Sequence, residues 1–215
     1  MRAPAAETAK QSMMAELKER AERAAPAICQ AGHSGLVWGE GSLSALIAIV
    51  GEAPGDKEEK LGRPFVGPAG RLLDRELERA GLKREQTWIT NVVKCRPTRE
   101  TRAGTINRPP AVKEVHDWLG FLMEELTIIS PRVIVCAGAV AASALIHKSF
   151  ALTKDRGRWF EGPLGTRAIA TFHPAYLLRQ VGDAWDSSMA AFRSDLRQAA
   201  EVARPLQGAE PDAAV

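Results

Sequence analysis

Short apolar runs alternate with amphipathic stretches along most of this chain, and this alternation restricts the possible folds most strongly. Three runs, "SALIAIV" (44–50), "TWITNVV" (87–93) and "PRVIVCAG" (131–138), have the length and composition of buried strands. The segment "GRWFEGPLGTRAIATFHP" (157–174) is typical of two further strands around a Gly-Pro turn. Apolar residues at helical spacing predict helices over residues 9–25, 68–82, 111–129, 139–149 and 185–196. This order predicts a three-layer α/β/α sandwich with a mainly parallel central sheet.

The size and composition of the chain fit a single globular domain. With 215 residues, of which 45% are hydrophobic and 26% charged, the chain can bury one full core. We expect one domain over residues 1–203 and a disordered tail over residues 204–215. No apolar run approaches the length of a membrane span, and the N-terminus has no signal-peptide block. A cytoplasmic location is therefore expected.

The three cysteines are widely spaced. Cys29, Cys95 and Cys136 form no Cys-x-x-Cys pair, so the sequence signals neither a zinc ribbon nor a disulfide framework. Cys136 lies inside a predicted strand and is expected in the core. A metal or redox site built from Cys29, Cys95 and His116 is an alternative that the spacing argues against.

Polar and turn-forming residues follow three of the predicted strands. They are the segments "GEAPG" (51–55), "NVVKCRP" (91–97) and "HPAYLLR" (173–179). Ligands of parallel α/β sheets bind beyond the carboxyl ends of the strands, so we expect these segments to meet at one edge of the sheet.

The first of these segments combines two carboxylates with bare backbone. Gly51 and Gly55 let backbone N–H groups approach a ligand closely, while Glu52 and Asp56 supply negative charge. Each acid taken alone is more simply explained as a turn or helix-start residue. Together they suit a reaction that builds positive charge on one atom and negative charge on another. The pattern matches neither the Walker nor the dinucleotide-binding motif.

Three further side chains could form a slot for a flat ligand. Phe65 lies in the rigid segment "GRPFVGPAG", where a ring can cover a planar base, although most phenylalanines are core residues. Asn91 ends the second strand, and its carboxamide either terminates the strand or pairs with a donor–acceptor edge such as that of uracil. His173 precedes a proline, and a neutral imidazole there could donate a hydrogen bond to a developing oxyanion.

Positive charge gathers after the second strand. The net charge is +3, and residues 94–108 hold five cations against one acid, in a stretch whose Pro97 and Gly104 indicate a loop. Such a loop is commonly just solvated, and phosphate binding is the alternative. The segment "AYLLR" (175–179) suits a wedge that enters a duplex with its arginine on phosphate. It also suits a helix start, and we expect one of its two leucines to pack in the core.

Three segments resemble the signature motifs of the family-4 type of uracil-DNA glycosylase, in the family's order. They are "GEAPGDKEEKLGRPFVGPAGRLL" (51–73), "NVVKCRP" (91–97) and "HPAYLLR" (173–179). Further similarity lies in "VWGEGSLSALIAIV", "ISPRVIVCAGAVAASALI" and "RGRWFEG". The resemblance covers nearly everything from about Cys29 to Arg179, and three co-ordinated motifs make it specific.

The resemblance implies an enzyme that flips deoxyuridine out of DNA and hydrolyses its N-glycosidic bond, as the first step of base-excision repair. By similarity, Glu52 positions or activates the water and supports the sugar cation, with Asp56 as its rival, and His173 stabilises the departing base. Phe65 is expected to stack on uracil and Asn91 to read its edge. The backbone contacts to the base are expected from Gly51, Ala53 and Gly55. The expected DNA-binding residues are Lys94, Arg96, Arg102, Asn107, Arg108, Tyr176, Leu177, Leu178 and Arg179.

The chain departs from this family at its cysteines. Members of the family-4 type hold an iron–sulfur cluster on four cysteines, but here Gly32 stands at the second position and Val115 and His116 at the fourth. Cys29 and Cys95 are therefore at most remnants of a cluster site, since two cysteines cannot hold such a cluster. We expect no metal, no cluster and no other cofactor. We also expect packed apolar side chains to take over the structural role that the cluster has in the family. His116 as a substitute ligand is a minor alternative.

A second departure concerns the related X-type enzymes, which share "PGDKE" and trap the abasic sugar on a loop histidine. Asn107 stands at that position, and an amide is no nucleophile for this purpose, so turnover is expected. A non-catalytic or covalently trapping reader of uracil-containing DNA is the alternative function. We expect a monomer that binds uracil-containing DNA, without a membrane or an obligate protein partner, associated with the nucleoid of a bacterium-like cell.

Overall fold

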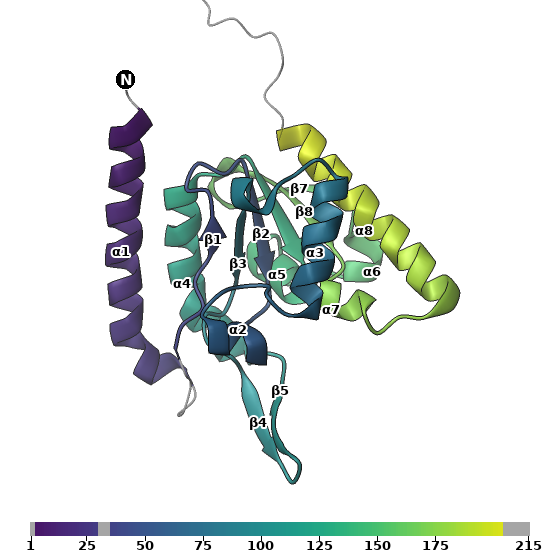
Figure 1. Cartoon of the computed structure of the whole chain (residues 1–215), viewed down its shortest axis with the longest axis horizontal. Coiled ribbons are helices and arrows are strands. Elements are labelled where there is room, and N and C mark those ends of the chain that lie inside the picture. The colour runs from purple at the N-terminus through teal and green to yellow at the C-terminus, as the bar shows by residue number, and fades with distance from the viewer. Residues whose placement is uncertain (1–2, 30–34, 204–215) are drawn as a thin grey trace, which may run out of the picture.

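Six strands form the central sheet of the protein, in the order β1-β3-β2-β6-β8-β7 (Figure 1). The computed structural model describes residues 3–29 and 35–203, so the tail predicted over 204–215 lies outside the described residues. The inner strands β2 (Ile47–Gly51), β3 (Trp88–Asn91), β6 (Val133–Ala137) and β8 (Arg167–Thr171) are parallel. The edge strands β1 (Glu40–Gly41) and β7 (Trp159–Glu161) are antiparallel to their neighbours. The mainly parallel sheet predicted from the sequence is confirmed.

Helices cover both faces of this sheet, because the strand residues alternate between two cores. Ala48 and Val50 belong to the core shared with α1 (Ala3–Ile28), α4 (Val112–Ile129) and α5 (Ala139–Leu145). Ile47 and Ile49 belong to the core shared with α3 (Pro68–Arg79), α7 (Pro174–Leu177) and α8 (Gly182–Ala203). The three-layer arrangement is therefore confirmed. None of the described helices has both the length and the apolar character that crossing a membrane requires.

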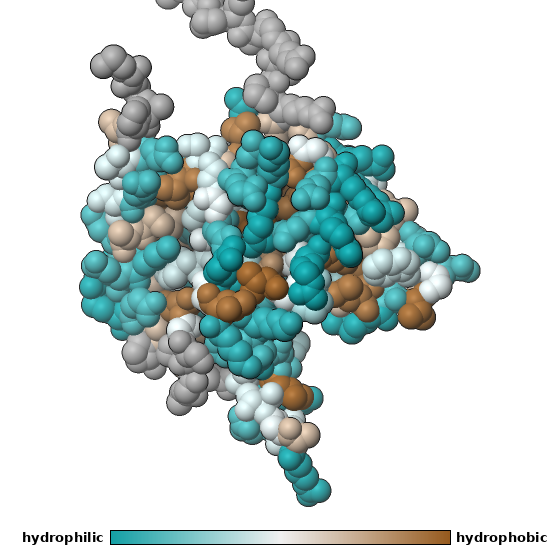
Figure 2. Space-filling model, viewed as in Figure 1, coloured by the Kyte–Doolittle hydropathy of each residue, from teal (hydrophilic) through white to brown (hydrophobic). Residues whose placement is uncertain are grey.

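Several short elements were not predicted. The helices α2 (Asp56–Leu61) and α6 (Leu152–Asp155) and the 3-10 turns η1 (Arg84–Gln86) and η2 (Pro163–Gly165) are too short to show a period. Residues 98–107, expected as a loop, form an antiparallel pair of strands, β4 (Thr98–Thr101) and β5 (Gly104–Asn107). This β4–β5 ribbon projects away from the body of the protein, with a hydrophilic tip (Figures 1 and 2).

Lys94 is the first cation of the basic stretch 94–108 and was expected to face DNA, but the structure contradicts this expectation. Its side chain is 0% exposed, and its ammonium lies 2.5 Å from a carboxylate oxygen of Glu125. The same ammonium donates to the hydroxyl of Thr90 and to the backbone carbonyl of Asn91. Glu125 also accepts a hydrogen bond from the indole of Trp88. Lys94 is thus part of a buried network beneath the end of β3 and cannot reach DNA.

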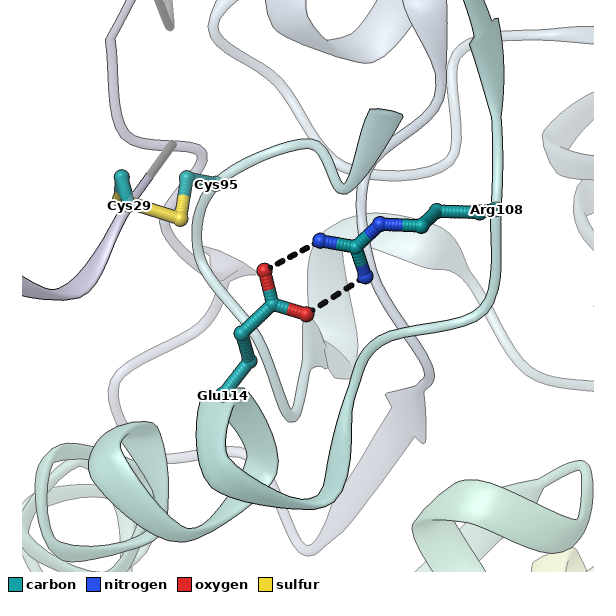
Figure 3. The surroundings of a disulfide bond; sticks show 4 residues. All are labelled: Cys29, Cys95, Arg108 and Glu114. Atoms are coloured by element: carbon teal, nitrogen blue, oxygen red, sulfur yellow. Dashed lines mark hydrogen bonds and ion pairs between the residues drawn. A yellow bond between two sulfur atoms is a disulfide. The ribbon is translucent and has the colours of Figure 1, made fainter. Parts of the chain in front are cut away.

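A disulfide joins Cys29, at the end of α1, to Cys95, which follows β3 (Figure 3). The spacing of the cysteines did not signal this disulfide, because the fold brings together two residues that lie 66 positions apart. Their Cα atoms are 6.0 Å apart, a usual separation for a disulfide. Cys136 is a buried free thiol in β6, as its position in a strand predicted.

Candidate active site

A pocket of about 410 Å³ opens where β2, β3 and β8 end. Segments that are far apart in the sequence therefore surround one cavity. The predicted site residues that line it are Glu52, Ala53, Gly55, Asp56, Phe65, Asn91, Asn107, Arg108 and His173. Lys57, Glu58 and Ala175 also line it and were not predicted.

Gly51, also predicted as a site residue, does not line the pocket itself but packs closely behind two residues that do, Phe65 and Asn91. A Cβ atom at Gly51 would lie 2.4 Å from Oδ1 of Asn91 and 2.5 Å from the Phe65 ring, so only glycine allows this approach. Asn91 is 2% exposed, and its buried Oδ1 has no hydrogen-bond partner among the described residues. A buried acceptor without a donor is unfavourable by about 1–3 kcal/mol. The amide is therefore poised to accept a hydrogen bond from a ligand.

The loop that carries Phe65 is held on both sides. Phe65 has a φ of +51°, a left-handed conformation that is uncommon for any residue but glycine. A carboxylate oxygen of Glu58 accepts hydrogen bonds from the backbone N–H groups of Val66 and Gly67, at 3.0 and 2.8 Å. From the other side, Arg84 donates to the backbone carbonyls of Phe65 and of the proline before it. These contacts fix the ring against the pocket.

His173 lies beside Phe65, with the two ring centroids 5.7 Å apart and an interplanar angle of 29°. Its Nδ1 accepts a hydrogen bond from the backbone N–H of Ala175 at 3.1 Å. This contact assigns the proton of the neutral ring to Nε2. Burial, and secondarily the charge of Arg179, lowers the pKa of His173 to about 4. At neutral pH the residue is an uncharged imidazole with an N–H to donate.

The two carboxylates at the pocket differ in their surroundings. Burial raises the pKa of Glu52, an effect that the charge of Arg179 partly opposes. Its side chain makes no hydrogen bond or ion pair with the part of the chain that the structure describes. Asp56 begins α2 and is paired with Lys60 at 2.7 Å and with Arg96 at 2.8 Å. The hydrogen bond from Lys60 is the main reason why the pKa of Asp56 is lowered.

Besides Lys94, two further predicted DNA-binding cations are paired within the protein. Arg96 contacts Asp56 and donates to Oδ1 of Asn107 at 2.6 Å. Arg108 forms a two-pronged ion pair with Glu114, with both distances at 2.7 Å (Figure 3). Both arginines therefore brace the segment between β3 and α4. Arg102, in contrast, is exposed at the tip of the β4–β5 ribbon.

The "AYLLR" segment divides between the core and the surface. Leu177 is 0% exposed and packs in the core shared with α3 and α8, so its predicted contact with DNA is wrong. The expectation that one leucine packs in the core is met by this residue. Leu178 is 43% exposed, Tyr176 is 37% exposed, and Arg179 is also exposed.

The cysteines do not fit a four-cysteine cluster. The chain has three, and Cys136 is enclosed within the sheet, which leaves the disulfide-bonded pair Cys29 and Cys95. His116, the substitute ligand considered above, is exposed and lies near Asp117. Over residues 3–29 and 35–203, no group of three or more His, Cys, Asp or Glu side chains is placed to hold a metal ion.

Comparison with known proteins gives consistent matches. A family model described as the uracil DNA glycosylase superfamily matches residues 38–197. The type-4 uracil-DNA glycosylase of Thermotoga maritima is 40% identical over 171 residues, which are 79% of this chain and 85% of the relative. The type-4 enzyme of Pyrobaculum aerophilum is 39% identical over 67% of this chain and 74% of the relative. That of Archaeoglobus fulgidus is 39% identical over 66% of this chain and 71% of the relative. The chain belongs to the uracil-DNA glycosylase superfamily and is similar to its type-4 members, as the sequence motifs predicted.

Proposed function

We propose that this protein hydrolyses the N-glycosidic bond of deoxyuridine in DNA, releasing uracil and leaving an abasic site. The observation that carries the proposal is that Glu52, Phe65, Asn91 and His173 all line one pocket. Cleavage of a glycosidic bond builds positive charge on the sugar, and in this case negative charge on the leaving base. A carboxylate and a neutral donor on one pocket meet both requirements.

Uracil is held by its face and by its edge. The ring of Phe65 stacks on the face, a contact worth about 1–3 kcal/mol. The unpartnered Oδ1 of Asn91 accepts the ring N–H, and the amide nitrogen donates to the adjacent carbonyl. Glu58 and Arg84 keep the stacking ring in place through the backbone around Phe65.

His173 stabilises the departing uracil anion. Its Nδ1 is occupied by a backbone N–H, so Nε2–H donates to the base oxygen on which charge develops. A preorganised donor of this kind contributes about 3–4 kcal/mol to the stability of the transition state. The lowered pKa of His173 keeps the ring neutral, so it acts as a hydrogen-bond donor at neutral pH.

Glu52 is favoured over Asp56 for the sugar cation and the water. Its carboxylate has no protein cation bound to it within the described residues, so its charge and its oxygens are available to the substrate. Asp56 is already neutralised by Lys60 and Arg96. Hydrolysis then needs no metal or cluster, and we expect full activity in the presence of chelators.

The exposed part of the "AYLLR" segment faces the DNA. Flipping a nucleotide out of the duplex costs a few kcal/mol, because the base loses its stacking and pairing. Leu178 and Tyr176 fill the space that the nucleotide leaves, and Arg179 binds a neighbouring phosphate. Uracil opposite guanine is flipped most easily, since a mismatch is already weakened.

Turnover is proposed in place of covalent capture. Asn107 lines the pocket at the position where the X-type group has its histidine, and its Oδ1 accepts a hydrogen bond from Arg96. An amide held in this way cannot attack the abasic sugar. The protein is proposed to work as a monomer in the cytoplasm, next to its DNA substrate.

The test is release of uracil from an oligonucleotide that contains one deoxyuridine, followed by alkali cleavage at the abasic site. Glu52→Gln and His173→Ala are expected to lower kcat by about a hundredfold or more. Asp56→Asn is the matched control, with kcat near that of the unchanged protein. Binding without strand cleavage in the unchanged protein would instead indicate a non-catalytic reader, and a denaturant-resistant adduct would indicate covalent capture.

A further inference from the structure

The β4–β5 ribbon stands beside the pocket, and apart from Asn107 at its base none of its residues takes part in the function proposed above. All four residues of β5 are exposed, as are three of the four residues of β4. Figure 1 shows the ribbon reaching out from the edge of the body that also carries α2 and α7. Burial of apolar side chains therefore does not explain why the chain forms this ribbon.

The base of the ribbon is fixed to the pocket wall. The backbone N–H of Arg108 donates to the carbonyl of Pro97 at 3.1 Å, and its guanidinium donates to the carbonyl of Thr98 at 3.0 Å. The side chains of Arg96 and Asn107 are bonded across the base at 2.6 Å. Pro97, Asn107 and Arg108 also line the pocket. The direction in which the ribbon projects is therefore fixed relative to the pocket.

The two outer arginines of the ribbon are available to a partner. Arg99 and Arg102 are exposed, and neither forms a hydrogen bond or an ion pair with another described side chain. The only acid of the ribbon, Glu100, accepts a hydrogen bond from Thr105 across the strand pair. The other three cations of the basic stretch, in contrast, are each paired with a carboxylate of the protein itself. The pairs are Lys94 with Glu125, Arg96 with Asp56 and Arg108 with Glu114. The charge that the basic stretch presents to solvent thus comes from the ribbon.

The dimensions of the ribbon match a duplex better than a single strand. Strands of four residues extend by roughly 13 Å, since each residue adds about 3.4 Å. When a flipped nucleotide is held in the pocket, the DNA strand that carries it lies at the pocket mouth. A ribbon of this length reaches past the sugar-phosphate backbone of that strand. A two-stranded ribbon also fits the major groove, which is about 12 Å wide.

We propose that the β4–β5 ribbon grips double-stranded DNA beside the flipped nucleotide, with Arg99 and Arg102 on phosphates, and makes the enzyme prefer duplex substrates. This inference rests on the proposed function and adds to it the form of DNA that is bound. Arg179, which follows α7, contacts the DNA from a second segment at the pocket, since Ala175 of α7 also lines it. The duplex is then held by two segments beside the lesion.

The test compares kcat/KM for one deoxyuridine oligonucleotide as a single strand and as a U·G duplex. In Arg99→Ala/Arg102→Ala the duplex KM is expected to rise severalfold, while kcat and single-strand activity stay unchanged. The slope of log affinity against log salt for duplex binding should fall by about 2, one unit for each lost phosphate contact. The control is Lys83→Ala/Arg197→Ala, which removes two exposed charges, one at the start of η1 and one on α8, that belong to neither the pocket nor the ribbon.

A second variant, in which residues 99–106 are replaced by two glycines, repeats the test without relying on single side chains. Equal losses on both substrates, or an unchanged salt slope, would overturn the role of the ribbon. Binding is measured by fluorescence anisotropy and does not depend on catalysis. Lower duplex affinity in the variants together with no uracil release by the unchanged protein would support the ribbon and reject the proposed function.

Discussion

Lys94 and Arg102 belong to the same basic stretch of sequence, but the fold gives them opposite environments. Lys94 is enclosed beneath β3 against Glu125, which lies 31 positions further along the chain. Arg102 is exposed at the tip of the β4–β5 ribbon. Composition places both in a candidate DNA-binding segment, whereas the partner that buries Lys94 is visible only in three dimensions. The role of a single charged residue therefore depends on which residues it contacts in the folded protein.

Replacing Lys94 tests this distinction through stability. Lys94→Met leaves the Glu125 carboxylate buried without its cation, and such a loss lowers the free energy of unfolding by about 3–5 kcal/mol. Urea denaturation measures the change. Lys94→Met/Glu125→Gln should recover part of it, because the neutral amide still accepts the hydrogen bond from Trp88. A Lys94→Met protein of unchanged stability but with a reduced salt slope of DNA binding would place Lys94 at the DNA instead.

The pH dependence of kcat should report on Glu52. Glu52 acts as a carboxylate and its pKa is raised above the ordinary 4.5, so activity is lost as pH falls through a value higher than that. His173, with a pKa of about 4, becomes charged only at lower pH. Arg179→Gln removes the cation that opposes the shift of Glu52, so the acid limb of the profile should move to higher pH.

Arg102→Gln is the control for this pH profile, since Arg102 lies away from the pocket on the β4–β5 ribbon. Its acid limb should coincide with that of the unchanged protein. An acid limb that stays in place in Arg179→Gln would show that another group than Glu52 carries the titration.

Among the elements, those that bury an apolar surface could be predicted from sequence. The runs that form β2, β3 and β6 are apolar because both faces of the sheet are covered. The helices α3, α4 and α8 show a helical period because each buries one face. The β4–β5 ribbon buries nothing, so its polar residues carry no period, and its order comes from strand pairing and from the braced base.

Site residues could be predicted from the sequence only where the type of side chain and its local motif suggest a chemical role. The sequence singled out Glu52, Phe65, Asn91 and His173, which line one pocket. It did not single out Glu58, whose carboxylate matters because it reaches backbone N–H groups eight and nine positions later. The same limit applies to the pairing of Cys29 with Cys95, which depends on how α1 packs against α4.

The disulfide fastens α1 to the segment that leads from β3 to the ribbon. Cys29→Ser should lower the free energy of unfolding by about 2–4 kcal/mol, because the unfolded chain loses a constraint between distant residues. Urea denaturation without reductant measures the loss. The unchanged protein should lose the same amount on adding reductant, while Cys29→Ser should not respond. Three reactive thiols in the denatured, unreduced protein, in place of one, would contradict the disulfide.

For the molecule as a whole, the position of the pocket links ligand binding to global stability. Its walls come from the ends of β2, β3 and β8, which are parts of one sheet with helices on both faces. Unfolding either core separates these ends and destroys the site. A ligand that binds only the assembled pocket must therefore stabilise the entire fold.

Free uracil, as the product of the proposed reaction, should raise the melting temperature of the protein. At about one hundred times its dissociation constant, a ligand of the native state adds about 2.7 kcal/mol to the free energy of unfolding. In Asn91→Ala the shift should vanish with little loss of intrinsic stability, because Oδ1 of Asn91 has no hydrogen-bond partner among the residues that the structure describes. Arg102→Ala should keep the full shift, since Arg102 lies outside the pocket. Cytosine presents the reverse order of donors and acceptors, which only a flipped amide could pair with, so an equal shift with cytosine would contradict an Asn91 amide held in the orientation that reads uracil. A shift that persists in Asn91→Ala would place uracil outside the pocket that the three strand ends surround.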